Sequence, residues 1–217
     1  HKSYAAEVTL GVQTDTDDAE GEQIVARPIT CSKEEANQML LSFLGKSKQN
    51  PPTYSALKVH GKPMYKYARE GIKVEKAPRD IEIKTIENIS INLPSISFEV
   101  SCSKGTYIRS IARDLGELLG CGGHLSALKR LTQQDFLLKD AKTIDEINEQ
   151  DIIPLEQAFN HLGSVHISEE QLKKFMNGSA IDLSLSENSL LRVYNSENVF
   201  IALGRNSSEG FKHEYLV

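Results

Sequence analysis

Residues 102–116 read Cys-Ser-Lys-Gly-Thr-Tyr-Ile-Arg-Ser-Ile-Ala-Arg-Asp-Leu-Gly and connect two different hydrophobic patterns. The residues before this segment, Ile96 to Cys102, alternate between apolar and polar side chains, which predicts a half-buried strand. Apolar residues then recur at helical spacing from Ile108 to Leu119, which predicts a helix. Gly105 can adopt a left-handed backbone that most residues avoid, and Thr106 is a favourable helix cap. We therefore expect a strand that leads into a helix through a tight turn.

The turn between this strand and this helix predicts a corner that accepts an anion. The first amides of a helix have no partners within the helix and attract negative groups. Lys104 flanks the corner, and Arg109, about one turn into the helix, is placed to present its planar guanidinium to a phosphate or a carboxylate. From local spacing alone, an ordinary capped helix behind a strand explains the segment equally well.

The order of residue types in this segment is more specific than the spacing of its apolar residues. Residues 103–116 resemble the Ser-Lys-Gly-Thr-Tyr-Ile-Arg-Ser-Leu-Ala-Arg-Asp-Leu-Gly motif of the TruB family of tRNA pseudouridine synthases. Residues 120–125 continue the family's pattern, with Gly123 where an alanine is expected. The resemblance implies isomerisation of uridine to pseudouridine at position 55, in the T-loop of tRNA.

The positive charge of the chain is gathered in two segments. The 217 residues are 39% hydrophobic and 25% charged, with a formal net charge of −5. Residues 46–79 hold nine Lys or Arg against two acids, and residues 101–131 hold five against two, so these segments carry +7 and +3 and the remainder carries −15. An acidic body with local positive charge suits a protein that holds a phosphate backbone at one place. A solvated charge run is the alternative.

Several classes of protein find no support in the sequence. No apolar run approaches the roughly 20 residues that span a bilayer, and no leader opens the chain, so we expect a cytoplasmic protein without membrane association. The three cysteines Cys31, Cys102 and Cys121 are odd in number and far apart, which favours reduced thiols over a disulfide or a zinc site. The acidic loop, residues 14–21, has Arg27 where a calcium loop needs its bidentate Glu, so we expect no metal. No Gly-rich nucleotide loop occurs, so we expect no cofactor, and we expect a monomer.

The resemblance also assigns roles to individual residues near the target base. Lys2, Tyr4, Leu10 and Gly11 match the family's Lys-x-Tyr and Leu-Gly signature. By position, Tyr4 would stack on the base and serve in proton removal, and Arg109 would pair with the catalytic carboxylate. Tyr107 and Leu128 would line the pocket. Without the resemblance, a lone strand tyrosine more often packs in a core or at a sheet edge.

Residues 48–79 mix prolines, tyrosines and cations with little apolar pattern. Such a mixture suits RNA, since cations hold phosphates while aromatic rings stack on unpaired bases. The segment resembles the family's Pro-Pro-x-Tyr-Ser-Ala and Tyr-x-Tyr-Ala-Arg-Glu-Gly motifs, which implies a thumb-like insertion that closes over the T-loop. We assign tRNA binding to Lys58, Lys62 and Tyr65. A protein-binding loop is the alternative.

One part of the family's pattern is missing. In the family an aspartate attacks or otherwise stabilises the sugar while the glycosidic bond breaks; the uracil then rotates, its C5 bonds to the sugar, and the C5 proton leaves. That aspartate lies in a Gly-x-Leu-Asp-Pro motif upstream of the Tyr4 strand, and the motif does not occur in the 217 residues. Asp15, Asp17 and Asp18 belong to the acidic loop, so we do not expect them to replace it. We expect this chain, which opens without Met, to be inactive alone.

Two other functional classes stay open on the sequence alone. A tRNA-binding protein or RNA chaperone would keep the basic segments and the tyrosines without the aspartate. A different RNA-modifying enzyme would need a donor site of its own.

The predicted fold is α+β, a mixed and largely antiparallel sheet flanked by helices. We expect a pseudouridine synthase catalytic domain over residues 1–160, with the thumb inserted at 48–79. Short strands with Asn, Ser and Gly turns follow in residues 166–217, which resemble a small PUA-like domain.

Overall fold

The computed structural model describes residues 1–72, 74 and 77–217 and forms two compact units, His1–Ala141 and Lys142–Val217. Three charged residues of the basic segment 46–79, namely Lys73, Glu75 and Lys76, lie outside the described residues. Within the described part of the chain, no helix has the length and apolar character needed to cross a membrane. The predicted boundaries at residues 160 and 166 stay a prediction.

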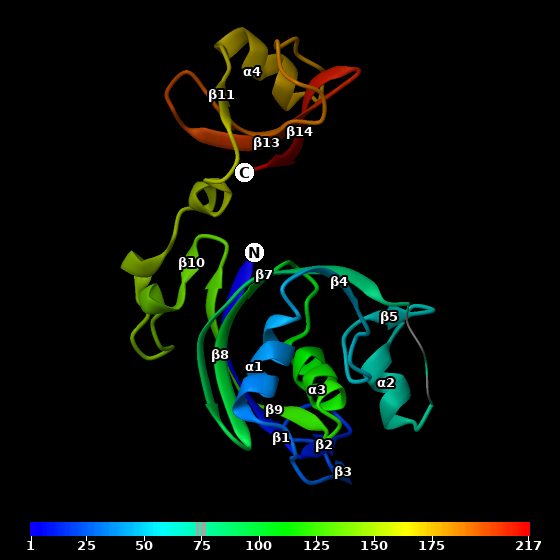
Figure 1. Cartoon of the computed structure of the whole chain (residues 1–217). Coiled ribbons are helices and arrows are strands. Elements are labelled where there is room, and N and C mark those ends of the chain that lie inside the picture. Colours follow the sequence, from blue (N-terminus) through cyan, green and yellow to red (C-terminus); the bar gives the residue numbers. More distant parts are fainter. Residues whose placement is uncertain (73, 75–76) are drawn as a thin grey trace. The chain divides into compact units, whose positions relative to one another are not determined.

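The first unit is built on a six-stranded sheet in the order β10-β9-β1-β8-β7-β4 (Figure 1). Every pair of neighbouring strands in it is antiparallel. The strands are β1 (Lys2–Leu10), β4 (Gly45–Gln49), β7 (Arg79–Asn92), β8 (Ser95–Cys102), β9 (Gly123–Gln133) and β10 (Phe136–Leu137). The two helices α1 (Lys33–Leu41) and α3 (Ile108–Leu118) lie on one face of this sheet (Figure 1). The predicted α+β class is confirmed.

Strand β8 and helix α3 occupy the segment in which the sequence predicts a strand and a helix. In β8, Ile96, Phe98, Val100 and Cys102 are buried in alternation with half-buried polar residues. The turn after β8 depends on Gly105, whose φ of +86° is the left-handed conformation that favours glycine. The predicted helix cap is wrong, because the N-cap residue is Tyr107 rather than Thr106.

The buried face of the sheet and the two helices share one hydrophobic core. Helix α1 begins with a capping box, in which Ser32 and Glu35 bond to each other's backbone amides. Its buried residues Ala36 and Leu40 face the sheet side of the core. The largest fully buried core side chains of this unit are Leu10, Leu40, Ile83, Ile96, Phe98, Ile111 and Leu115. This core fixes α3 against the centre of the sheet.

Helix α3 approaches the start of β9 backbone to backbone. A Cβ added to Gly116 would lie 2.1 Å from the Gly123 nitrogen and 2.2 Å from the Gly122 carbonyl carbon. A Cβ on Gly123 would lie 2.8 Å from the Ala112 oxygen. Here Gly123, the departure from the family's pattern, has a physical role, since it allows α3 to sit this close to the sheet.

Two segments outside the six-stranded sheet contact the N-terminal half of α3. The acidic loop joins β2 (Val12–Thr14) to β3 (Gln23–Ala26). The thumb leaves β4 after Gln49 and returns at Arg79, and these two residues are partners in the β4–β7 pair. Within the thumb lie β5 (Lys58–Val59), β6 (Lys62–Pro63) and α2 (Met64–Arg69). The thumb therefore begins and ends at a single strand pair.

The second unit contains a four-stranded sheet in the order β11-β12-β13-β14. Its strands and helix are β11 (Ser164–His166), β12 (Leu190–Tyr194), β13 (Phe200–Ser207), β14 (Gly210–Leu216) and α4 (Glu169–Met176). Short 3-10 helices lie at Glu149–Asp151 and Leu155–Phe159 in this unit and at Leu138–Asp140 in the first unit. The unit has its own core, in which Phe175 stacks on Phe211 at a centroid separation of 5.7 Å. The prediction of short strands in this region is confirmed.

Candidate active site

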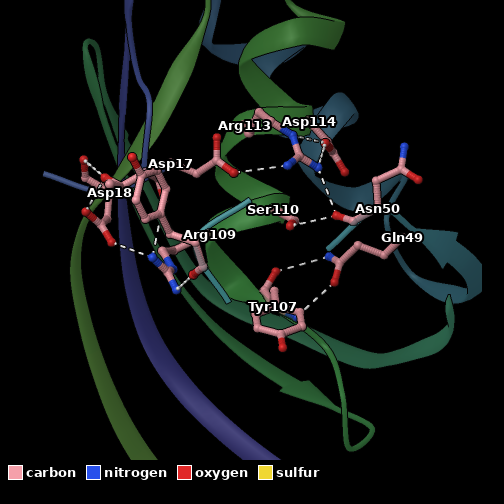
Figure 2. A network of polar contacts seen from close by, with 11 residues as sticks. Asp17, Asp18, Gln49, Asn50, Tyr107, Arg109, Ser110, Arg113 and Asp114 are labelled. Atoms are coloured by element: carbon pink, nitrogen blue, oxygen red, sulfur yellow. Dashed lines mark hydrogen bonds and ion pairs between the residues drawn. The ribbon is translucent and has the colours of Figure 1, made fainter. Parts of the chain in front are cut away.

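Two neighbouring aspartates of the acidic loop pair with two arginines on one side of α3. Asp18 Oδ2 lies 2.8 Å from Arg109 Nη1, and Asp17 Oδ2 lies 3.0 Å from Arg113 Nη1. Residues four apart on a helix are neighbours on its surface, so two adjacent loop residues can reach both arginines. Figure 2 shows the pairs side by side. They fix the acidic loop against the N-terminal half of α3.

This arrangement adds a contact that the sequence does not predict. The expectation that Asp17 and Asp18 do not replace the family's catalytic aspartate stays a prediction. In the folded chain the loop packs directly on α3, and Asp18 contacts Arg109 itself. The loop also bonds to β9, since the Leu125 amide donates to the Asp17 carbonyl over 3.0 Å.

Arg109 lies on the wall of a cavity of about 330 Å³. The residues that line it come from the acidic loop, α3 and β9: Asp18, Ala19, Glu20, Arg109, Leu125, Ser126, Ala127 and Leu128. Arg109 Nη1 also donates to the Thr16 carbonyl over 3.3 Å, and its Nη2 donates to the Tyr54 carbonyl over 3.0 Å. The guanidinium of Arg109 therefore lines the cavity and is bonded to both the acidic loop and the thumb.

Arg113 forms a second, more buried set of contacts behind Arg109. Its Nε and Nη2 donate to Asp114 over 2.9 and 2.7 Å, and Nη2 also donates to the Asn50 carbonyl over 3.1 Å. The side chain of Arg113 is 15% exposed and that of Asp17 is 8% exposed. Burial therefore raises the pKa of Asp17 to about 6, although the Arg113 charge opposes this shift. Burial also raises the pKa of Asp114.

The start of α3 receives its cap from the root of the thumb. Tyr107, the N-cap residue, has no side-chain cap of its own. Its amide donates to Gln49 Oε1 over 2.8 Å, and its carbonyl accepts from Gln49 Nε2 over 3.1 Å. The sequence did not predict this buried glutamine, since nothing local marks a partner 58 residues away. Gln49 thus occupies one amide of the expected anion corner, and anion binding there stays a prediction.

The residues predicted to surround the base lie at different distances from the cavity wall. Leu128, which is 47% exposed, lines the cavity with Arg109. Tyr4 is 8% exposed on β1, and the guanidinium of Arg130 lies 5.6 Å from the centre of its ring. Among the described residues, neither Tyr4 nor Tyr107 is one of those that line this cavity. The roles given to all four residues stay predictions.

The predicted RNA-binding residues of the thumb lie on its hairpin and short helix. Lys62 Nζ lies 2.5 Å from Glu70 Oε2 and 4.6 Å from the centre of the Tyr67 ring. The Arg69 guanidinium lies 5.5 Å from the centre of the Tyr65 ring. Lys58 is exposed on β5. Cations close to aromatic rings are present, but part of the Lys62 charge is already balanced by Glu70.

The fold and the site have clear counterparts among known proteins. The chain is similar in fold to a solved chain of a Cbf5-Nop10-Gar1 complex, with a TM-score of 0.69 and 21% identity over 99% of this chain and 66% of that one. A structure of an H/ACA RNP bound to a substrate RNA containing 2'-deoxyuridine has a similar fold, with a TM-score of 0.67 and 19% identity, covering 99% of this chain and 65% of that one. These likenesses show that the chain shares the fold of those two chains.

The sequence comparisons then identify the family. Residues 1–108 match the TruB family pseudouridylate synthase N-terminal domain, residues 109–162 the tRNA pseudouridylate synthase B C-terminal domain, and residues 163–211 the Pseudouridine synthase II TruB C-terminal domain. The chain belongs to the TruB family, whose members are isomerases that act on RNA.

Relatives named tRNA pseudouridine synthase B support the same assignment. The chain is 40% identical to one from Clostridium kluyveri over 97% of this chain and 76% of the relative. It is 43% identical to one from Alkaliphilus oremlandii over 83% of this chain and 62% of the relative. The chain thus spans roughly two thirds to three quarters of these relatives' length. Their names support isomerisation of tRNA uridine and give no support to a protein that only binds RNA.

Proposed function

We propose that this protein takes part in the isomerisation of uridine to pseudouridine at position 55 in the T-loop of tRNA. The observation that carries the proposal is Arg109, a half-buried guanidinium on the wall of a cavity that also contains Leu128. The relatives' shared name supports the same reaction. We infer that the protein is cytoplasmic, since tRNA is a cytoplasmic substrate. We also infer that it acts as a monomer and uses no metal or cofactor.

Arg109 would hold the carboxylate that acts on the sugar. A guanidinium has five N–H groups, and the hydrogen bonds of Arg109 to other described residues use three of them. The remaining N–H groups can donate to a second carboxylate beside Asp18. A nearby positive charge keeps such a carboxylate ionised, as a nucleophile requires. Asp18 would orient Arg109 for this task.

The thumb would hold the T-loop over the cavity. The target uridine must leave the base stack, and stacking on aromatic rings offsets part of that cost. Tyr4 would stack on the flipped base, and Tyr107 would complete the pocket. Lys58, Lys62 and Tyr65 would bind the RNA around it. The second unit would act as a small PUA-like domain.

Release of tritium from tRNA labelled at uridine C5 tests the proposal. The 217-residue chain is compared with a version extended upstream by a segment that carries the family's Gly-x-Leu-Asp-Pro motif. We expect release only from the extended version, with T-loop binding by both. Binding by both without release from either would leave a binding-only protein. Tritium release by the 217-residue chain without the extension would mean that one of its own carboxylates acts as the catalytic carboxylate. Asp18 would then be the first residue to substitute.

A further inference from the structure

We propose that Arg113 is a positioning residue, which ties the root of the thumb to the acidic loop and so sets the thumb's place relative to Arg109. The inference rests on the proposed function, in which the thumb holds the RNA over the cavity. Nothing in the family assignment gives Arg113 this role.

Asn50 is the first thumb residue after β4, and its carbonyl is bonded to α3. This one oxygen accepts from Ser110 Oγ over 2.9 Å and from Arg113 Nη2 over 3.1 Å. The preceding residue, Gln49, holds the Tyr107 backbone through both atoms of its amide group. Two consecutive residues are therefore bonded to the first two turns of α3. Figure 2 shows these contacts along one side of the helix.

Arg113 contacts three different parts of the chain. Its three nitrogens reach Asp17 in the acidic loop, Asp114 in α3 and Asn50 in the thumb at the same time. A planar guanidinium places its N–H groups on three separate nitrogens, so it spans acceptors that lie too far apart to be reached from one ammonium nitrogen. Arg113 is therefore selected by shape as well as by charge.

The acidic loop connects the contacts of Arg113 to the cavity. Asp17, which holds Arg113, is bonded in the chain to Asp18, which holds Arg109. A displacement of the acidic loop would move both aspartates together. Arg113 thus fixes the thumb root and the partner of Arg109 to the same helix, and the RNA-binding and base-binding parts of the site keep one relative position.

The variant Arg113→Lys separates shape from charge. Lysine keeps the positive charge, but its single ammonium cannot span the three acceptors. Loss of a hydrogen bond by a charged donor weakens an interaction by about tenfold, so we expect the Kd for a T-arm stem-loop RNA to rise about tenfold. The slope of log Kd against log salt stays unchanged, because no phosphate contact is lost. In the free protein, trypsin cleaves faster within residues 50–72.

Three controls make the outcome decisive. Thermal unfolding confirms that the variants are folded at the assay temperature. Arg27→Lys is the matched control, because it makes the same exchange at an exposed arginine whose Nη1 donates to the Gly120 carbonyl over 3.5 Å. We expect it to leave the Kd and the rate of tryptic cleavage unchanged. Ser110→Ala removes the other donor to Asn50 and tests the same link if Arg113→Lys does not fold. It gives the same changes to a smaller degree.

Two results would overturn the proposal. An unchanged Kd and unchanged cleavage in a folded Arg113→Lys variant would make Arg113 a purely structural residue. A salt slope reduced by about one in the neutral variant Arg113→Gln would instead make Arg113 a direct phosphate contact. Failure of the wild-type chain to bind the RNA would count against the proposed function, and tryptic cleavage would still decide the role of Arg113 without RNA.

Discussion

Asp18 lies within 2.8 Å of Arg109, although 91 residues separate them in the chain. Both side chains are about one quarter exposed, so the pair faces the cavity and is not sealed in the core. The pair therefore marks the part of the site at which a substrate can meet a fixed positive charge.

Replacement of Arg109 should separate turnover from binding. In the extended enzyme, Arg109→Ala leaves the catalytic carboxylate without its partner, and we expect turnover to fall by roughly 10³-fold or more. The Kd for tRNA should change little, because the thumb cations supply most of the affinity. Single-turnover tritium release and filter binding measure the two quantities. Arg27→Ala is the control, and unchanged turnover in Arg109→Ala would refute the assigned role.

The thumb lysines should determine the salt dependence of binding. Replacing Lys58 and Lys62 with Gln is expected to weaken tRNA binding and to lower the slope of log Kd against log salt by about one to two. Glu70→Gln is the informative counterpart. Since Glu70 lies 2.5 Å from Lys62, its neutralisation should release the lysine and tighten binding. Titrations from low to moderate salt test both effects, and an unchanged slope in the double variant would contradict the assignment.

The burial of Asp17 should appear in the pH dependence of stability. Its pKa of about 6 in the folded protein lies above the ordinary value of 3.8, so the folded state binds this proton more tightly than the unfolded chain. The resulting stabilisation is complete below about pH 3.8 and is lost as the pH rises through 6. Relative to Asp17→Asn, the wild-type protein should therefore lose up to roughly 3 kcal/mol of unfolding free energy between pH 4 and 7.

Urea unfolding at a series of pH values measures this difference. Asp145→Asn, at an exposed carboxylate, is the matched control and should follow the wild-type protein at every pH. A constant difference between Asp17→Asn and the wild-type protein would show that Asp17 keeps an ordinary pKa in the folded state.

The close approach of α3 to β9 should make Gly116 intolerant of any side chain. A methyl group there would overlap the backbone of Gly122 and Gly123, and strain of this kind costs about 1–3 kcal/mol or more. We expect Gly116→Ala to lower the thermal unfolding midpoint of the first unit. Gly163→Ala is the control, since its added Cβ would meet the flexible end of Leu191 at 3.0 Å. Equal midpoints for the two variants would argue against the packing described.

The local parts of this fold could be predicted from the sequence, and the long-range parts could not. Alternation in β8 and helical spacing in α3 are properties of a few consecutive residues, so both elements were predicted within a residue or two. The place of Arg109 in α3 follows from the same pattern. Its presence on the cavity wall agrees with the role implied by the family motif.

The errors share a physical cause. Thr106 was assigned as the cap because caps are normally local, whereas Gln49 supplies this one from 58 residues away. The pairing of Asp17 and Asp18 with two arginines of a distant helix was likewise not predicted, because the partners lie more than 90 residues away. Tertiary contacts of this kind leave no periodic signal in the sequence.

The pairing of consecutive aspartates with arginines one helical turn apart also constrains how the acidic loop can vary. Exchanges at the exposed Ala19 or Glu20 leave both pairs in register. One residue inserted between Thr14 and Asp17 would move Asp17 to the place of Asp18 and leave Arg113 without its carboxylate. One residue deleted there would move Asp18 to the place of Asp17 and leave Arg109 facing Ala19. The length of this loop is therefore under tighter control than its composition.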